Sequence, residues 1–247
     1  MKKNMCETTG QLNKETKVHH IFEVISGKYD LMNNVISLFL HKKWRRNALE
    51  EIRMEKGSRV IDLCCGTGVW TVDLAHQVGR EGMVYGIDFS KAMLNLAGEK
   101  LFFSGLDNVS LLYGNIKSIP FAEGFFDYAT LGFGLRNVSG TRVALSEIQR
   151  VLKPGGKLLC LETSKPSSPL LRHLYYLYLR YLVPFLGFVL AKRFKEFRYL
   201  QESTWLFPEK DELVLIFCEA GFEDITVTEF IYGVVTMYTM VKGKRNI

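Results

Sequence analysis

One stretch constrains the fold of this chain more than any other: residues 59–68, which read RVIDLCCGTG. An apolar run leads into a turn that contains Gly66 and Gly68, and a second apolar run, MVYGID, ends about twenty residues later at Asp88. A buried strand, a glycine-rich turn into a helix and a second strand that ends in an acid are typical of a parallel sheet whose carboxyl edge binds a ribose-containing cofactor. The pattern therefore predicts an α/β fold with a nucleoside site.

The turn departs from the dinucleotide-binding pattern G-x-G-x-x-G, because Thr71 stands where the third glycine belongs. Asp62 lies at the start of the turn, where its charge would repel a pyrophosphate. A ligand with an adenosine and a cationic tail but no phosphate suits both acids, with Asp62 near an ammonium group and Asp88 on the ribose hydroxyls. S-adenosylmethionine is such a ligand. The alternative is that Gly66 and Gly68 only make a tight turn.

Length and composition are those of one folded domain, and we predict a single domain over residues 1–247. No pair of cysteines has CxxC spacing, which argues against a disulfide framework or a metal site and for a reducing, cytoplasmic compartment. The five cysteines are Cys6, Cys64, Cys65, Cys160 and Cys218. The formal net charge of +6 is compatible with nucleic acid, with an anionic membrane surface or with neither.

Helices are expected before the sheet and strands alternate with helices within it. Residues 1–17 are polar and are expected to be disordered, whereas residues 18–57 carry apolar side chains at helical spacing and are expected to form a helical cap. Alternating strands and helices predict a mostly parallel sheet, and the last two strands predict an antiparallel hairpin. The expected strands are residues 59–63, 83–88, 109–113, 126–132, 157–162, 225–230 and 234–242.

Residues 166–207 interrupt this alternation with an insert rich in aromatic residues and leucine. Its longest uncharged run, residues 181–191, is shorter than the roughly 20 apolar residues of a membrane-spanning helix and contains Pro184 and Gly187. Two interpretations stay open: a lid helix packed on the sheet, or a surface that dips into the membrane interface and meets anionic lipids. The basic residues are Arg172, Arg180, Lys192, Arg193, Lys195 and Arg198.

Separate segments, in order over residues 18–242, resemble one family, the class I C-methyltransferases of menaquinone and ubiquinone biosynthesis. They are YDLMNNVISLFLHKKWR (29–45), DLCCGTG (62–68), GIDFSKAML (86–94), GNIKSIPF (114–121), GFGLRNV (132–138), RVLKPGGKLLCLETSKP (150–166) and YLQES (199–203). The resemblance implies a Rossmann-like sheet and methyl transfer from S-adenosylmethionine, with S-adenosylhomocysteine as product, to a ring carbon of a prenylated quinol.

The cysteine-containing turn and the E-T-S block look more like the members that serve menaquinone alone. They imply demethylmenaquinol as the acceptor and menaquinol as the product. The alternative is a dual-function member that also methylates 2-methoxy-6-polyprenyl-1,4-benzoquinol.

Site residues follow by matching motif. The resemblance implies cofactor contacts at Thr67 in the glycine turn and at Asp88 after the second expected strand. It also implies that Asn115 and Ile116, after the third, flank the adenine. Gly132 departs from the pattern, because the dual-function members have a serine there that contacts the cofactor.

The expected chemistry requires a nucleophilic ring carbon, and a ring carbon beside a hydroxyl becomes nucleophilic as that hydroxyl loses its proton. The acceptor should therefore be the reduced quinol. Arg136 is expected to stabilise the developing phenolate or to orient a water that accepts the proton, and Asn137 to hold a quinol oxygen. The alternative for Arg136 is an ion pair with a surface acid. Tyr29 resembles the substrate-facing segment of the family, or it packs within the cap.

A prenylated acceptor requires the protein to reach the bilayer, so we expect peripheral contact with an anionic membrane through residues 166–207, and a homodimer is left open. The enzymatic rival is a class I methyltransferase that acts on RNA or another small molecule. Its basic residues would follow a phosphate path, whereas here they are mixed with leucine and tyrosine, so no nucleic-acid partner is expected. The non-catalytic rival is a peripheral membrane protein that keeps only the fold.

Overall fold

The computed structural model describes residues 2–243, with side chains from residue 14 onward. Helices come first, as the sequence predicts. They are α1 (Lys2–Ile25), η1 (Ser26–Lys28), α2 (Tyr29–Ile36) and α3 (Leu40–Ile52).

Residues 2–17 of the segment expected to be disordered are instead part of α1. Residues 14–17 are helical, and the Lys14 ammonium donates hydrogen bonds to the carbonyl oxygens of Arg136 at 3.1 Å and Val138 at 3.2 Å. The expectation of disorder is wrong here, because Lys14 and Glu15 bind the body of the protein at Arg136, Val138 and Lys117. Residue 1 lies outside the described residues.

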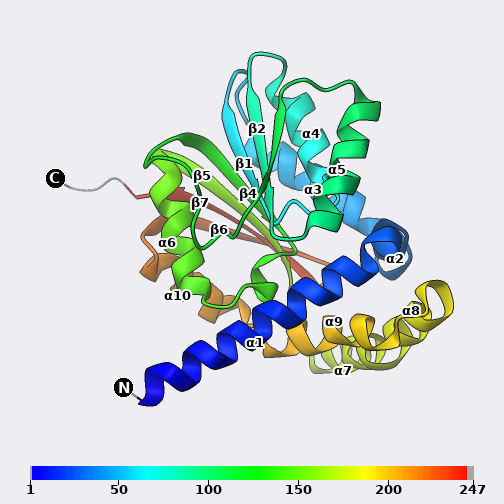
Figure 1. The fold of residues 1–247 in the computed structure, drawn as a ribbon. Helices are drawn as coiled ribbons and strands as arrows, with labels where there is room; N and C mark the ends of the chain where they lie inside the picture. The colour runs from blue at the N-terminus through cyan, green and yellow to red at the C-terminus, as the bar shows by residue number, and fades with distance from the viewer. Residues whose placement is uncertain (1, 244–247) are drawn as a thin grey trace.

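A seven-stranded sheet forms the centre of the molecule, in the order β3-β2-β1-β4-β5-β7-β6 (Figure 1). The strands are β1 (Arg59–Leu63), β2 (Met83–Asp88), β3 (Val109–Tyr113), β4 (Phe126–Gly132), β5 (Leu152–Thr163), β6 (Phe222–Phe230) and β7 (Val235–Lys242). Strands β1 to β5 pair in parallel, and β7 runs antiparallel to both of its neighbours. The predicted mixed sheet with a C-terminal hairpin is confirmed. The strand order reverses between β1 and β4, where sheets of this type bind ligands beyond the carboxyl ends of the strands.

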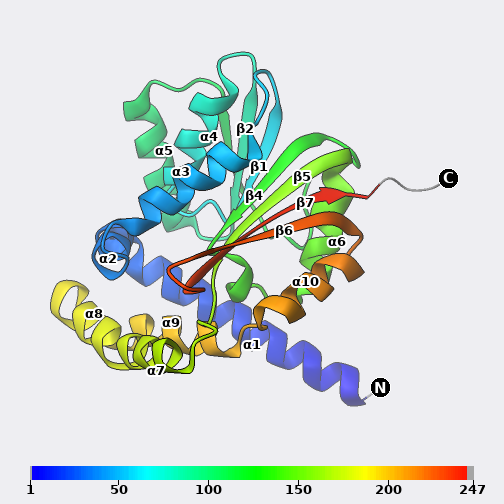
Figure 2. The same cartoon turned by 180° about the vertical axis from the view of Figure 1, so that it is seen from behind.

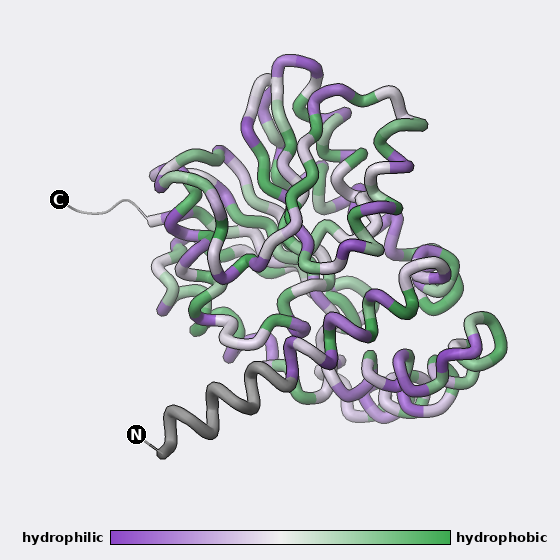
Figure 3. Tube along the Cα trace, viewed as in Figure 1, coloured by the Kyte–Doolittle hydropathy of each residue, from purple (hydrophilic) through white to green (hydrophobic). Residues whose placement is uncertain are grey.

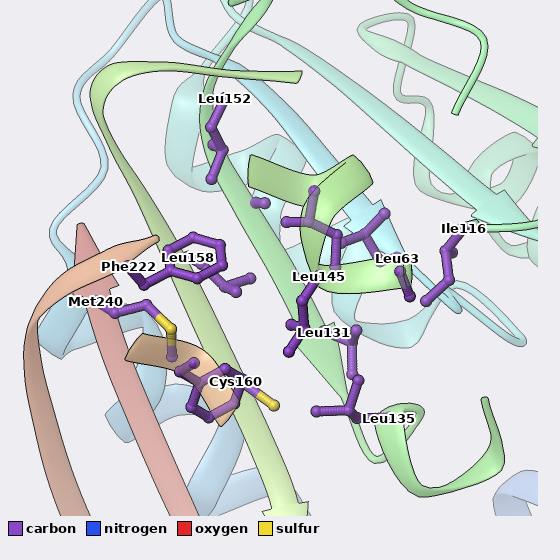
Figure 4. Packing of buried hydrophobic residues seen from close by; sticks show 14 of the residues in the cluster. Leu63, Ile116, Leu131, Leu135, Leu145, Leu152, Leu158, Cys160, Phe222 and Met240 are labelled. Carbon is purple, nitrogen blue, oxygen red and sulfur yellow. The ribbon is translucent and has the colours of Figure 1, made fainter. Parts of the chain in front are cut away.

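Helices cover both faces of the sheet because successive strand residues point to opposite sides. On one face, Val60 packs with Trp44 of α3 and Leu74 of α4. On the other, Ile61 packs in a core with Leu145 of α6 and Phe217 of α10, part of which is drawn in Figure 4. The covering helices are α4 (Val69–Val78), α5 (Lys91–Ser104), α6 (Thr141–Val151) and α10 (Lys210–Glu219).

The insert forms a separate helical layer. Its elements are α7 (Pro169–Leu177), the π-helix η3 (Tyr178–Leu182), α8 (Val183–Ala191) and α9 (Phe194–Leu206). Figures 1 and 2 show α1 between this layer and the lower edge of the sheet. A third core joins the layer to the first helices, with Ile21 and Met32 packed among Leu179, Val183 and Phe197. One of the two open interpretations placed a lid helix on the sheet, whereas the buried core of this layer is formed with residues of α1, α2 and α5.

Residues 169–191 form one continuous helix, which by length and composition is long and apolar enough to cross a membrane. The sequence argument from the longest uncharged run underestimated this helix, because Pro184 does not end it. Pro184 lies at the start of α8, directly after the π-helical turn, and is buried together with Gly187. Only 22% of the most apolar window of the helix is buried in the protein.

Candidate active site

A cavity lies at the carboxyl edge of the sheet, at the point where the strand order reverses. We name it the edge cavity. Glu15 and Phe22 of helix α1 line the outer side of this cavity. Tyr29, the first residue of α2, also lines it. The sheet contributes the loops after β1 to β4, with Cys64, Gly66, Asp88, Asn115, Ile116, Gly132, Phe133 and Asn137. Five of the predicted cofactor or catalytic positions after the strands are therefore brought together here: Gly66, Asp88, Asn115, Ile116 and Asn137.

Asp88 is the only acid at the end of a strand in this cavity, among the residues that are described. Its Oδ2 accepts a hydrogen bond from the Gly66 N–H and its Oδ1 accepts one from the Ser90 N–H, both at 2.9 Å. Burial raises the pKa of the Asp88 carboxyl, and these N–H donors oppose that shift. Each oxygen keeps a lone pair for a further donor. The carboxylate is thus fixed in place and able to accept two hydroxyl groups of a ribose.

The glycine turn is built from left-handed backbone at three positions, Cys64 (φ 54°), Gly66 (φ 56°) and Gly68 (φ 74°). A non-glycine residue in this region costs about 1–2 kcal/mol, and the turn therefore holds some strain at Cys64. Gly68 lines none of the cavities described here. A Cβ on Gly68 would lie 2.8 Å from the Cβ of Ala97, so Gly68 lets the start of α4 approach α5.

A smaller inner cavity lies beneath α3 and shares Tyr29, Cys64, Gly66 and Gly132 with the edge cavity. Asp62 and Arg45 are its charged residues in the described part of the chain. Asp62 is 1% exposed, and it accepts hydrogen bonds from the hydroxyls of Thr71 at 2.6 Å and Thr130 at 2.9 Å. Burial raises the pKa of Asp62 to about 6, and both hydroxyls and the charge of Arg45 oppose the shift.

Thr67 also lines the inner cavity, and its hydroxyl is already engaged. It donates to a carboxylate oxygen of Asp30 at 2.7 Å, and Lys100 binds the other Asp30 oxygen at 2.5 Å and the Thr67 carbonyl at 2.8 Å. These contacts fasten α2 to the glycine turn. The predicted cofactor contact of Thr67 stays a prediction, and its side chain holds the cap in place.

Gly132 has no room for a side chain. A Cβ there would lie 2.7 Å from the ring of Trp70 on α4. The serine of dual-function members would therefore clash with Trp70 unless that ring moved. Glycine at position 132, in place of the serine of dual-function members, thus leaves the space that the Trp70 ring occupies.

A second, larger cavity of about 390 Å³ adjoins the edge cavity and is mainly apolar; we name it the acceptor-side cavity. Tyr29 and Phe133 line both cavities and so mark their junction. Its walls come from α2, α3, α7, α9 and the turn between β6 and β7, with Ile36, Leu171, Leu174, Tyr175, Tyr178, Leu200 and Val234. Its polar residues include Arg136 and His41.

Arg136 forms a buried ion pair with Glu162, which the sequence reasoning missed. The guanidinium binds a Glu162 oxygen and donates to the Phe133 carbonyl at 2.7 Å, and the Arg136 N–H donates to the other Glu162 oxygen at 3.2 Å. Glu162 is 1% exposed. Arg136 therefore pairs with an acid, as the alternative interpretation held, but with a buried acid beside the acceptor-side cavity instead of a surface one. Its Nε is buried without a partner among the described residues.

Arg136 and Asn137 face different cavities although they are adjacent. They lie on the short helix η2 (Leu135–Asn137), so their side chains diverge. Asn137 lines the edge cavity, where its Nδ2 donates to the Phe133 carbonyl at 3.3 Å and its Oδ1 is buried without a partner in the described chain. The expected contact of Asn137 with a quinol oxygen stays a prediction, and the geometry favours the nucleoside side.

The sheet order, the edge cavity at the strand-order reversal and the acid after β2 define a class I methyltransferase fold. The fold is similar to a "SAM dependent methyltransferase" from Aquifex aeolicus (TM-score 0.60, 23% identity, 80% of this chain and 89% of that one). It is also similar to a possible histamine N-methyltransferase from Thermotoga maritima (TM-score 0.64, 21% identity, 90% of this chain and 99% of that one). At these identities the similarity concerns the fold.

Residues 10–242 match the model of the ubiE/COQ5 methyltransferase family. The chain is 48% identical over 226 residues to the demethylmenaquinone methyltransferase of Geobacillus kaustophilus (92% of this chain, 97% of the relative). It is 46% identical over 234 residues to that of Staphylococcus aureus strain Newman (95% and 96%). This chain belongs to the ubiE/COQ5 methyltransferase family, which confirms the family inferred from the motifs.

Proposed function

We propose that this protein transfers the methyl group of S-adenosylmethionine to a ring carbon of demethylmenaquinol, giving menaquinol and S-adenosylhomocysteine. The observation that carries the proposal is the junction at Tyr29 and Phe133, where the edge cavity, with the fixed carboxylate of Asp88, meets the mainly apolar acceptor-side cavity of about 390 Å³. Two ligands that occupy these cavities meet at that junction. Relatives that are 45–48% identical are named demethylmenaquinone methyltransferase, which supports demethylmenaquinol as the acceptor.

The cofactor site fits S-adenosylmethionine at both ends. Asp88 has free lone pairs for the ribose hydroxyls, and Asn115 and Ile116 line the cavity where the adenine would lie. In the inner cavity the Nε of Arg45 is buried without a partner among the described residues, close to the Asp62 carboxylate. A zwitterionic amino acid satisfies both charges, its carboxylate on Arg45 and its ammonium on Asp62.

On the acceptor side, this chain must hold the quinol and keep its ring rich in electrons. When bound, the cofactor supplies a methyl group that its sulfonium has already activated. The Arg136 guanidinium, held by Glu162, places a fixed positive charge in the acceptor-side cavity, where it stabilises a phenolate oxygen. Tyr29 lies at the junction and positions the ring against the methyl group.

The proposal is tested by methyl transfer from labelled S-adenosylmethionine to demethylmenaquinol and to 2-methoxy-6-polyprenyl-1,4-benzoquinol, each reduced and oxidised, under anaerobic conditions. We expect transfer to the reduced naphthoquinol and little transfer to either oxidised quinone. Faster transfer to the benzoquinol would refute the choice of acceptor. Equal transfer to reduced and oxidised rings would refute the phenolate mechanism.

The mouth of the acceptor-side cavity is proposed to face an anionic membrane. Exposed apolar residues from two turns line it, including Leu38 and Tyr232, each 76% exposed, and Ile231. The adjoining layer exposes Tyr181, Phe185, Phe188 and Phe194 beside basic residues, and Figure 3 shows hydrophobic and hydrophilic positions mixed along it. A prenyl tail that leaves by this mouth would pass directly into lipid.

The membrane contact is tested with three exposed basic residues where α8 ends and α9 begins. The variant Lys192→Gln/Arg193→Gln/Lys195→Gln is expected to bind vesicles rich in phosphatidylglycerol at least about tenfold more weakly, because each basic residue near such a surface contributes about 1 kcal/mol. The matched control, Lys56→Gln/Arg80→Gln/Lys157→Gln, removes the same charge at the amino edge of the sheet and should bind normally. Equal losses in both variants would mean that net charge alone governs binding.

A further inference from the structure

His41 is a buried histidine on the wall of the acceptor-side cavity. It lies on α3, is 7% exposed and shares this cavity with Tyr29 and Arg136. Among the described residues its side chain makes no hydrogen bond to Asp88 or to the Arg136–Glu162 pair. A buried polar side chain is kept at a cost unless its hydrogen-bonding atoms find partners in the protein or in a ligand.

The hydrogen bonds of Ser37 assign the tautomer of His41. The Ser37 hydroxyl lies 2.6 Å from the carbonyl oxygen of Asn33 and also 2.6 Å from the Nδ1 of His41. Its single proton goes to the carbonyl, which can only accept, so Nδ1 must carry a proton and donate to the Ser37 oxygen. The Nε2 of His41 is then an acceptor with a lone pair.

The surroundings of His41 keep the ring neutral. Burial and the charges of Arg45 and Lys42 lower its pKa to about 4, and only the charge of Asp30 and a hydrogen bond to Asn33 oppose that shift. At neutral pH the ring therefore presents one acceptor. A hydroxyl satisfies such an acceptor, whereas a carbonyl oxygen would oppose it with another lone pair.

We propose that the Nε2 of His41 accepts a hydrogen bond from a hydroxyl of the acceptor and thereby selects the reduced quinol over the oxidised quinone. The inference rests on the proposed function, since it concerns the acceptor bound in that same cavity. Arg136 stabilises the oxygen that loses its proton, and His41 recognises a hydroxyl that keeps one. Each of the two residues thus binds one oxygen of the quinol, and apolar side chains contact the rest of the ring.

The experiment measures the dissociation constants of demethylmenaquinol and demethylmenaquinone, anaerobically, for the wild type and for His41→Phe, which keeps a ring but lacks an acceptor. The wild type is expected to prefer the quinol by about tenfold to hundredfold, as a site does when one of its buried acceptors is left unpaired. H41F should bring the two affinities within about threefold of each other. The control His20→Ala alters an exposed histidine on α1 and should keep the wild-type ratio.

The ratio of the two affinities separates the possible results, since a general loss of binding leaves it unchanged. An unchanged ratio in H41F overturns the inference. Between pH 6 and 8 the wild-type ratio should stay constant, because His41 is neutral throughout, and a ratio that changes over this range would also overturn it. Ser37→Ala, which frees Nδ1, should reduce the ratio without abolishing it. If the wild type binds neither ring, the proposed function itself fails.

Discussion

Replacing Glu162 by glutamine is expected to destabilise the protein by about 3–5 kcal/mol, because it leaves the buried charge of Arg136 without its partner. Glu162 accepts hydrogen bonds from the Arg136 guanidinium and from two backbone N–H groups, those of Arg136 and Thr163. The glutamine side chain would turn an NH₂ group toward these donors or leave some of them unpaired. The measurement is the free energy of unfolding in urea, followed by tryptophan fluorescence.

The control is a salt bridge on the surface, between Arg142 and Glu219, whose side chains are 69% and 57% exposed. Glu219→Gln should change the free energy of unfolding by no more than about 1 kcal/mol, because water screens the pair. If E162Q lost no more stability than E219Q, the buried pair would contribute nothing beyond a surface pair.

A double substitution separates the structural role of the pair from its role in catalysis. Arg136→Met together with Glu162→Leu removes both charges and replaces them with apolar side chains. Such replacements often recover the stability that a single substitution loses. We expect this variant to unfold near the wild-type urea concentration and to bind the cofactor normally. Its kcat should fall by about 100-fold or more, because the positive charge that stabilises the phenolate is gone. Normal turnover would place Arg136 outside the reaction.

The sequence predicted which residues after β1 to β3 line the edge cavity, because these residues are local. The glycine turn directly follows β1, and Asp88 ends β2, so a strand–turn–helix pattern places them at the same edge. The resemblance to the family then supplied Asn115 and Ile116. All of these positions depend on contacts within a few residues of a strand end, and local pattern is sufficient to find them.

The acceptor side could not be predicted in the same way, because its residues meet only through the order of the strands and helices. Leu161 pairs with Gly132, which puts Glu162 beside the loop that carries Arg136. Nothing in the local sequence says that β4 and β5 are neighbours in this register. Glu15 likewise lines the edge cavity only because of the tertiary fold. Helix α1 lies across the edge of the sheet, although Glu15 is far in sequence from the strand ends that line the cavity.

The second large effect is expected for Asp88→Ala, which should raise the dissociation constant of S-adenosylmethionine at least about 100-fold. The Asp88 carboxylate is proposed to accept two ribose hydroxyls, and each charge-assisted hydrogen bond contributes about 1.5–3 kcal/mol. Two such bonds at the lower value already amount to this factor. The measurement is isothermal titration calorimetry, with Asp107→Ala, an exposed acid before β3, as the matched control.

A loss of affinity in D88A alone would not identify the ribose, because the variant also frees the N–H groups of Gly66 and Ser90 and could loosen the whole turn. Adenosine and 2′,3′-dideoxyadenosine settle the point, since they differ only in the two hydroxyls. The wild type should bind adenosine more tightly, and D88A should bind both equally. A preference for adenosine that survives in D88A would mean that another residue holds the ribose, since the effect of removing the hydroxyls is then independent of the carboxylate.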